Sequence, residues 1–242
     1  MKVIDKTGEI SPAAVQACTV HATDGTVKDS EDVIIHEHLV EISINRVPAM
    51  RLSCTPEDLA ELITGRLYTE GIIDRISDVE QLCIGETGSE AEVTLKHHLT
   101  TVQKRRMKVL KNAVTDYEAV FALARRFSED SKLHRLTGGT HSCYLYLPGG
   151  SIVSFEDISR HNAMDKAVGY ALLNDTDLSE CMLYTTGRVP GDMVIKAVMA
   201  GVPVLISKSV PTDEAVRLSR EYGLTLVYGA WPDSCRTIET AD

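Results

Sequence analysis

Three segments in the C-terminal half of the chain collect residue types that bind anions. Thr137-Gly138-Gly139-Thr140-His141 places two glycines before a predicted strand, and glycine lets backbone N–H groups approach an anion closely. Residues 156–166 follow a predicted strand and are rich in charged and imidazole side chains. Thr186-Gly187-Arg188 precedes a helix that Pro190 opens. An arginine beside a helix N-terminus favours a phosphate or pyrophosphate group.

Each segment also has an ordinary structural interpretation. The glycine pair could be a plain tight turn, residues 156–166 could be a solvated helix face with i,i+4 pairs, and Arg188 could be an exposed side chain. Three such segments beside predicted strand ends favour a binding role, because open α/β sheets bind ligands there. A fourth loop of this kind begins at Ser207. The contacts predicted within the second segment are Glu156, Asp157, Arg160, His161, Asn162, Asp165 and Lys166.

The N-terminal half supplies a first set of supporting elements. Residues 37–45 and 47–54 alternate apolar and polar side chains, which predicts a strand hairpin. A helix should follow, with Thr55 as its N-cap, Pro56 at its first position and Gly71 as its stop. Two short strands and a helix beginning after Asp116 come next.

From Thr137 onward, strands alternate with helices of about ten residues, which predicts βαβ units and a mostly parallel sheet. Residues 224–228 form the last expected strand. We therefore expect an α/β protein with three parts. These are an irregular N-terminal arm over residues 1–32, a small α+β subdomain of hairpin and helix over residues 33–112, and an α/β cofactor-binding domain over residues 113–242.

The net charge and the apolar content of the chain exclude some classes of function. The net charge of −10 over 242 residues argues against general nucleic-acid binding, since phosphate neutralisation needs a basic surface. The one basic tract, residues 104–111, is either a solvated segment or a docking site for an acidic partner or a phosphate-bearing ligand. No apolar run is long enough for a membrane span, and the N-terminus lacks a signal-peptide core. We expect a cytoplasmic protein.

The cysteines and histidines do not predict a metal site. The six cysteines are scattered, with no C-x-x-C pair and no histidine at zinc-ligand spacing. The two histidine clusters, His36-x-His38 and His97-His98, have no cysteine nearby. We expect mostly buried thiols in a reducing compartment and no bound metal.

The ordered set of motifs resembles a known family. TGGTH (137–141), EDISRHNAMDKAVG (156–169) and TTGRVPGDMVIKAVMAGVPVLISKSVPTDEAV (185–216) are similar to the formate dehydrogenase accessory protein family, also called FdhD/NarQ. EHLVEISINRVPAMRLSCTPEDLAELITGRLYTEGII (37–73) resembles the early hairpin and helix of that family. The resemblance extends over residues 35–240. It implies a cytidine-deaminase-like mixed sheet with flanking helices, without the deaminase zinc motif.

The resemblance also implies a function. Family members are sulfurtransferases required for formate dehydrogenase activity. They take sulfur from a cysteine desulfurase and pass it to the molybdenum cofactor, bis(molybdopterin guanine dinucleotide), which GDP mimics in part. The implied partners are thus a cysteine desulfurase and formate dehydrogenase. A further cofactor-binding segment aligns with Gly229-Ala230-Trp231-Pro232-Asp233-Ser234, where Trp231 and Ser234 stand in place of the usual arginines.

One departure from the family concerns the sulfur-carrying residue. Members usually carry a cysteine loop, often C-x-x-C, in the region that here reads Leu99 to Met107 without a cysteine. Persulfide transfer needs a thiolate. Cys143 lies on a predicted strand, and Cys54 precedes a predicted helix whose dipole should lower the pKa of its thiol. The simpler interpretation of both is a buried structural thiol.

Three functions therefore remain open. The first is sulfur transfer to the molybdenum cofactor, and the second is a non-catalytic chaperone that binds this cofactor or a guanine nucleotide. The third is a different enzyme in which His141 or His161 acts as general acid or base. The predicted hairpin and N-terminal arm could also support a homodimer.

Overall fold

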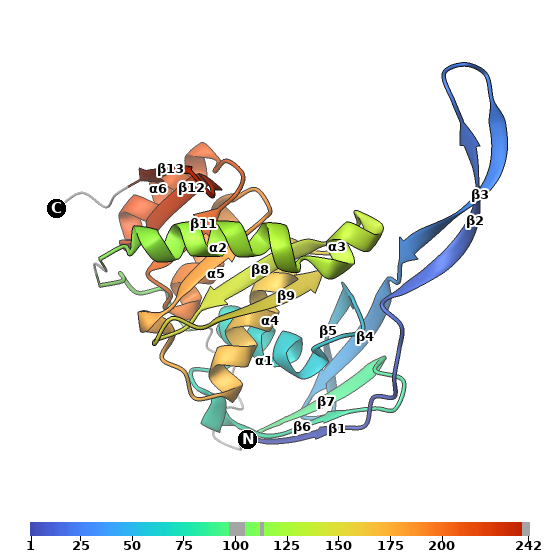
Figure 1. Ribbon diagram of the computed structural model, residues 1–242. Helices are drawn as coiled ribbons and strands as arrows, with labels where there is room; N and C mark the ends of the chain where they lie inside the picture. The colour runs from blue at the N-terminus through green and yellow to red at the C-terminus, as the bar shows by residue number, and fades with distance from the viewer. Residues whose placement is uncertain (97–104, 112–113, 239–242) are drawn as a thin grey trace.

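The protein contains two β-sheets separated by helices, together with a projecting hairpin (Figure 1). The computed structural model describes residues 1–96, 105–111 and 114–238. The first sheet has the strand order β1-β6-β7-β4-β5. Its strands are β1 (Lys2–Asp5), β4 (His38–Ile44), β5 (Val47–Cys54), β6 (Val79–Ile84) and β7 (Glu90–Leu95).

The second sheet is mixed and forms the larger half of the molecule. Its order is β13-β12-β11-β10-β8-β9, and its strands are β8 (His141–Tyr146), β9 (Ile152–Asp157), β10 (Met182–Thr185), β11 (Val204–Ser207), β12 (Thr225–Trp231) and β13 (Ser234–Ile238). Only the β10–β11 and β11–β12 pairs are parallel. The mixed α/β class is confirmed, whereas a mostly parallel sheet is wrong, because β8, β9 and β13 pair antiparallel with their neighbours.

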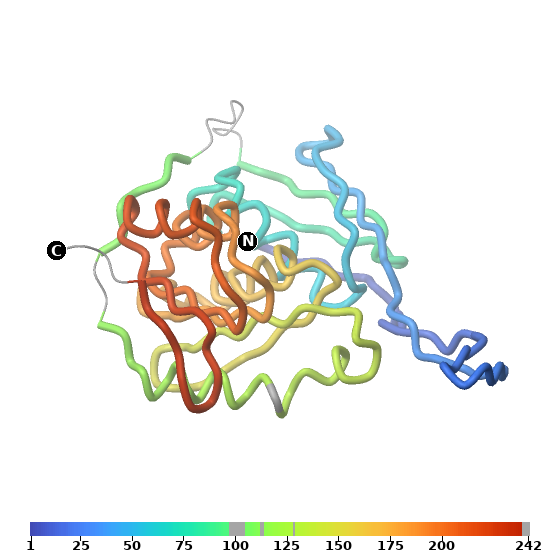
Figure 2. The backbone as a smooth tube through the Cα atoms, turned by 90° about the horizontal axis from the view of Figure 1, so that it is seen from above, coloured from blue at the N-terminus to red at the C-terminus, as the bar shows by residue number. Residues whose placement is uncertain are grey.

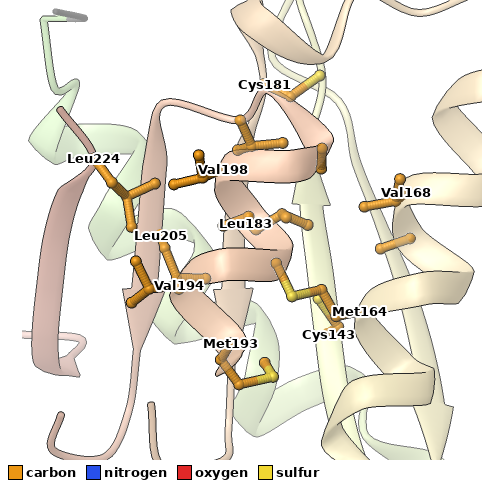
Figure 3. Close-up of a cluster of buried hydrophobic side chains, with 14 of the residues drawn as sticks. Cys143, Met164, Val168, Cys181, Leu183, Met193, Val194, Val198, Leu205 and Leu224 are labelled. Atoms are coloured by element: carbon orange, nitrogen blue, oxygen red, sulfur yellow. The ribbon is translucent and has the colours of Figure 1, made fainter. Parts of the chain in front are cut away.

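Helices lie on both faces of the second sheet. Side chains of α4, α5 and α6 share one apolar core with β8, β10, β11 and β12 (Figure 3), and side chains of α2 share another on the opposite face. α1 covers the first sheet and packs against α4. The helices are α1 (Leu59–Thr69), α2 (Tyr117–Asp130), α3 (Lys132–Thr137), α4 (Arg160–Leu173), α5 (Gly191–Ala200) and α6 (Asp213–Tyr222), with short 3₁₀ turns η1 (Ile76–Asp78) and η3 (Leu178–Glu180).

The N-terminal residues differ from the expected irregular arm. β1 pairs with β6 inside the first sheet. β2 (Ala13–His21) and β3 (Val27–Ile35) form a long antiparallel hairpin that projects away from the body (Figure 2). The sequence suggested an irregular segment because many of its residues are polar, and in the structure nearly every side chain of the hairpin is exposed. We call residues 13–35 the arm.

Most predicted helix and strand boundaries are confirmed, with two exceptions. Thr55 is not the N-cap of α1: the helix begins after Asp58, whose backbone is left-handed with φ 53°. Residues 224–228 are not the last strand, because β13 pairs with an extended β12. Among the described residues, no helix has the length and apolarity that crossing a membrane requires. The predicted domain boundary at residues 112 and 113 lies outside the described residues.

Candidate functional site

Strand register brings the predicted binding segments to one edge of the second sheet. His141 at the start of β8 pairs with Asp157 at the end of β9. Cys143 pairs with Thr185 at the end of β10, which pairs in turn with Ser207 at the end of β11. The start of β8 therefore lies at the same edge of the sheet as the ends of β9, β10 and β11. We call this edge, with the loops that leave it, the strand edge.

Two helices begin at the strand edge with free backbone N–H groups. Neither Ser159 before α4 nor Pro190 before α5 provides a side-chain cap, whereas Thr212 caps α6 by accepting from Ala215 N at 3.3 Å. The first N–H groups of a helix lack intrahelical partners and carry its positive dipole end. These two helix starts can therefore bind anionic oxygen atoms.

Two arginines at the strand edge lack a carboxylate partner among the described residues. Arg188 is exposed, and Arg160 is partly buried with its Nε atom unpaired. A Cβ atom added to Gly187 would lie 2.8 Å from Cδ of Arg160. Glycine is therefore needed at position 187 because the Arg160 side chain passes directly over the backbone there. The geometry leaves two guanidinium groups for an anion.

Hydroxyl groups fix the loops that carry these arginines. Ser207 Oγ donates to Gly187 O at 2.8 Å and accepts from Ser209 N at 2.9 Å. Thr186 Oγ1 accepts from Ser142 N at 3.0 Å. Ser207 and Thr186, both predicted ligand contacts, thus hold neighbouring loops together. A preorganised loop costs less entropy when a ligand binds.

Both candidate histidines lie at this edge and favour their neutral form. Burial lowers the pKa of His141, and the charges of Arg160 and His134 lower it further. Burial also lowers the pKa of His161, while Asp192, with its Oδ2 atom 3.5 Å from His161 Nε2, raises it. Each ring is therefore mostly neutral at pH 7, and an anion beside it would raise its pKa.

Four other predicted contacts belong to a buried polar network. Asp157 and Lys166 form an ion pair with Oδ2 and Nζ 2.9 Å apart, both side chains being fully buried. Asp165 accepts from Lys196 at 2.6 Å, and Asn162 Nδ2 donates to Asp157 at 3.0 Å. These groups already have protein partners, and their role in binding a cofactor stays a prediction.

This network also joins the two halves of the molecule. Thr55 Oγ1 accepts from Lys166 Nζ at 2.6 Å, and Thr55 N donates to Asp157 at 3.1 Å. Arg66 of α1 donates to Asn162 at 2.9 Å, and its Nε lies 2.8 Å from Asp165. Sequence reasoning treated Thr55 as a helix cap and missed Arg66, because only the tertiary fold brings them to α4.

The glycine pair lies before strand β8, as predicted, and it also ends helix α3. Gly138 ends α3 with φ 65°, and Gly139 lies against Ile35 at the base of the arm. Glu156 accepts from Leu133 N and His134 N at 2.9 and 2.8 Å, and from Thr140 Oγ1 at 3.1 Å. Glu156 therefore anchors α3 to the sheet. Thr137 and the glycines still lie next to His141.

The C-terminal predicted segment is part of a β-hairpin. Gly229 to Trp231 end β12, Pro232 and Asp233 make the turn, and Ser234 begins β13. Gly229 N donates to Ser209 O at 3.1 Å, which continues the strand edge beyond β11. Ala230 is fully buried against the α2 side of the sheet, whereas Trp231 to Ser234 are exposed.

The cysteines do not form a reactive centre at this edge. Burial and the charge of Asp157 raise the pKa of Cys54 to about 12, so the expected lowering by a helix dipole is wrong. Burial raises the pKa of Cys143, which lies in the apolar core beside Met164 (Figure 3), and burial and Asp177 raise that of Cys181 to about 12. Cys83 and Cys235 are partly buried, and Cys18 is exposed on the arm.

A cavity of about 880 Å³ opens beside His161, between α1, α4 and α5. Its walls include Arg105 and Arg106 of the predicted basic tract. Arg105 is structural: its guanidinium lies 3.9 Å from the Tyr68 ring centre and donates to the carbonyls of Tyr68 and Met199. Arg106 is exposed. Residues 99–104, most of the region where the family resemblance implies a cysteine loop, lie outside the described residues, as do His97-His98.

No group of three or more metal-ligating side chains gathers within the part of the chain that the structure describes. The strand edge instead combines two unpaired arginines, two uncapped helix starts and neutral histidines. These features define an α/β protein whose sheet edge presents groups suited to binding an anion.

Comparison with known proteins identifies the family. The profile of the FdhD/NarQ family matches residues 35–116 and 101–237, nearly the whole chain, and the protein belongs to that family. The chain is 34% identical to Protein FdhD of Methanocaldococcus jannaschii, with 82% of this chain and 85% of that protein aligned. It is 31% identical to Sulfur carrier protein FdhD of Halalkalibacterium halodurans, with 85% and 86% aligned.

A solved structure has the same fold. The crystal structure titled as a putative formate dehydrogenase accessory protein from Desulfotalea psychrophila superposes with a TM-score of 0.82 and 23% identity. It covers 95% of this chain, and 98% of its own length is matched. The mixed α/β architecture is therefore shared over almost all of both chains.

Proposed function

We propose that this protein is a cytoplasmic formate dehydrogenase accessory protein whose strand edge binds the guanine-dinucleotide end of the molybdenum cofactor. The cofactor is cargo for formate dehydrogenase. The observation that carries the proposal is the convergence of Arg160, Arg188 and two uncapped helix starts on one edge. The names of the relatives, which include sulfur carrier and formate dehydrogenase accessory protein, support the same role.

The residues present suit a diphosphate group. Arg160 has a buried Nε without a hydrogen-bond partner, and the Gly187 backbone beside it has no side chain to block access. Free N–H groups at the start of α5 lie within the same loop as Arg188. Guanidinium and helix N–H groups are the donors that phosphate oxygens prefer.

Calorimetry with GDP tests this site. Replacing Arg188 by alanine should weaken GDP binding about tenfold or more, because a charge-assisted hydrogen bond is lost. His161→Ala should also weaken it. Arg51→Ala is a matched control, since Arg51 lies on β5 and forms only an exposed pair with Glu41. GDP affinity unchanged in the Arg188 and His161 variants would refute the site.

Sulfur delivery from a cysteine desulfurase to this cofactor is the first form of the proposed role. It follows the names of the relatives and requires a cysteine that accepts and releases sulfur as a persulfide. Exposed Cys18 and partly buried Cys83 and Cys235 are the candidates that solvent reaches.

A second form, cofactor binding without sulfur transfer, is supported by a specific observation. Cys54, Cys143 and Cys181 are buried with raised pKa values, so little thiolate forms at neutral pH. Mass spectrometry after incubation with a cysteine desulfurase and cysteine separates the two forms. An added sulfur atom on any cysteine supports delivery, and no added sulfur supports binding alone.

A further inference from the structure

The basic tract of the sequence forms a surface segment that two backbone contacts hold in place. Its described part, residues 105–111, contains four cationic side chains and no carboxylate, in a chain with a net charge of −10. Arg105 N donates to Gly71 O at 3.0 Å, just after α1. Leu110 N donates to Tyr222 O at 2.8 Å, at the end of α6. The segment therefore has a fixed path although it is neither helix nor strand. We call residues 105–111 the basic strip.

The backbone of the basic strip is open between these two contacts. The N–H groups of residues 106–109 have no hydrogen-bond partner among the described residues. Exposure alternates as it does along a strand, because Arg106 and Lys108 are exposed while Arg105 and Met107 are partly buried. A row of unpaired backbone groups can pair with an extended segment of another chain.

Three cations of the basic strip are available to a partner. Arg106, Lys108 and Lys111 are exposed, and none of them has a carboxylate partner within the part of the chain that the structure describes. Arg105 is different, because its guanidinium lies over the Tyr68 ring and donates to main-chain carbonyls. The strip therefore presents a short row of positive charges that the fold itself does not use.

A groove of about 1260 Å³ lies beside the basic strip. Its lining includes Lys108 and Lys111 from the strip and Val198 from the end of α5. Val109, which is 69% exposed, adds an apolar side chain at the same place. Asp74 is the one carboxylate among the described residues that line the groove. The groove therefore offers cationic and apolar contacts next to an open backbone.

We infer that the basic strip docks an acidic, extended segment of a partner protein. The carboxylates of that segment pair with Arg106, Lys108 and Lys111, and its backbone carbonyls accept from the open N–H groups of residues 106–109. Complementary charge favours encounter at this surface, whereas the negative charge of the chain as a whole disfavours an acidic segment elsewhere. The inference is independent of the cofactor site proposed at the strand edge.

The basic strip suits a protein segment better than a nucleic acid. Stacking of bases needs exposed aromatic faces, and the Tyr68 ring, which lines the groove, carries the Arg105 guanidinium 3.9 Å from its centre. Nucleic-acid binding also needs a broad basic surface, and the net charge of −10 argues against one. The row of open N–H groups instead matches the carbonyl groups of a peptide backbone.

Fluorescence anisotropy with a fluorescein-labelled oligoglutamate peptide tests this surface on the full chain. The peptide should bind the unaltered protein, and added salt should weaken the affinity because the paired charges are exposed. The variant Arg106→Gln/Lys108→Gln/Lys111→Gln should weaken it about tenfold or more, since three ion pairs are lost. Hydrogen exchange at the backbone amides of residues 106–109 should slow when the peptide is bound.

Lys6→Gln/Lys28→Gln/Lys132→Gln is the matched control. It removes the same charge from exposed lysines outside the basic strip and its groove, so the peptide affinity should not change. Absence of peptide binding to the unaltered chain, or equal affinity of the two triple variants, overturns the inference. Unchanged amide exchange at residues 106–109 in the peptide complex overturns the backbone pairing. A single-stranded DNA oligonucleotide that binds more tightly than the peptide, and loses affinity in the strip variant, would assign the strip to nucleic acid instead.

Discussion

At the scale of residues, the protein depends on charges that are removed from water. Lys166 Nζ contacts Asp157, Thr55 and the Glu156 carbonyl, at 2.9, 2.6 and 3.1 Å, and its side chain is fully buried. A buried ion pair is no more stabilising than well-packed apolar side chains, but removing one partner leaves an uncompensated charge. Here the Lys166–Asp157 ion pair, with Thr55, connects the segment before α1 to the end of β9.

Replacing Lys166 by methionine should therefore lower the free energy of unfolding by about 3–5 kcal/mol, measured by urea denaturation. The double variant Lys166→Met/Asp157→Leu removes both charges and should recover part of that loss. A single variant as stable as the parent protein would show that the pair does not join the two halves.

The histidines predict a pH dependence of stability. Burial, Arg160 and His134 lower the pKa of His141 below its unfolded value of about 6.5. As the pH falls below that value, the unfolded chain takes up the proton first, so the free energy of unfolding should decrease between pH 6.5 and the lowered pKa.

An NMR titration of the imidazole should give a His141 midpoint below 6.5, and GDP should raise it. The His141→Asn variant should show a flatter dependence of unfolding free energy on pH in this range. A His141 midpoint at or above the ordinary value would contradict the burial argument.

At the scale of elements, two glycines allow α1 and α4 to pack backbone to backbone. A Cβ atom at Gly65 would lie 1.8 Å from Asp165 O, and one at Gly169 would lie 1.9 Å from Glu61 O. Both residues lie inside helices, where glycine costs about 1 kcal/mol relative to alanine. The close approach holds Asp165 within reach of Arg66 and Thr69, at 2.8 and 2.7 Å.

Alanine at either position should force the helices apart and destabilise the protein by about 3 kcal/mol or more, despite the better helix propensity of alanine. Thermal or urea unfolding of Gly65→Ala and Gly169→Ala measures this. Gly85→Ala serves as the control, because its added Cβ would meet its nearest neighbour at an ordinary 3.5 Å. Equal stability of all three variants would rule out the close packing.

At the scale of the whole molecule, the arm is a two-stranded hairpin that projects away from the rest of the protein. An isolated two-stranded hairpin is marginally stable in water, and this one exposes Val15 by 62% and Val27 by 59%. The register Val15–Val33 and His21–Val27 places both valines on the same face of the hairpin. We propose that this face packs on a second copy of the chain.

Light scattering should then give the mass of a homodimer for the unaltered protein. Val15→Glu combined with Val27→Glu should shift it to a monomer, whereas Lys28→Glu, which changes a residue on the opposite face of the arm, should not. A monomeric parent protein would refute the homodimer.

The amino-acid sequence by itself determined most of the elements after residue 36, the chemistry of the loops and the family. Local signals suffice for these, since strand alternation, caps such as Asp116 and Thr212, and the glycine at position 223 act within a few residues. The same signals located Arg160, His161 and Arg188 before any partner was known.

Only the tertiary structure decided which of these residues are available to a ligand. Asp157, Asp165 and Lys166 have the same residue types as a binding site, yet long-range contacts with Thr55, Arg66 and Lys196 use their charges. The mixed strand order likewise depends on which strands pair in space, and strand pairing is not a local property of the sequence. The close contact between Gly187 and Arg160 arises from packing between distant segments. Sequence patterns could name these two residues, and only the fold could show what surrounds them.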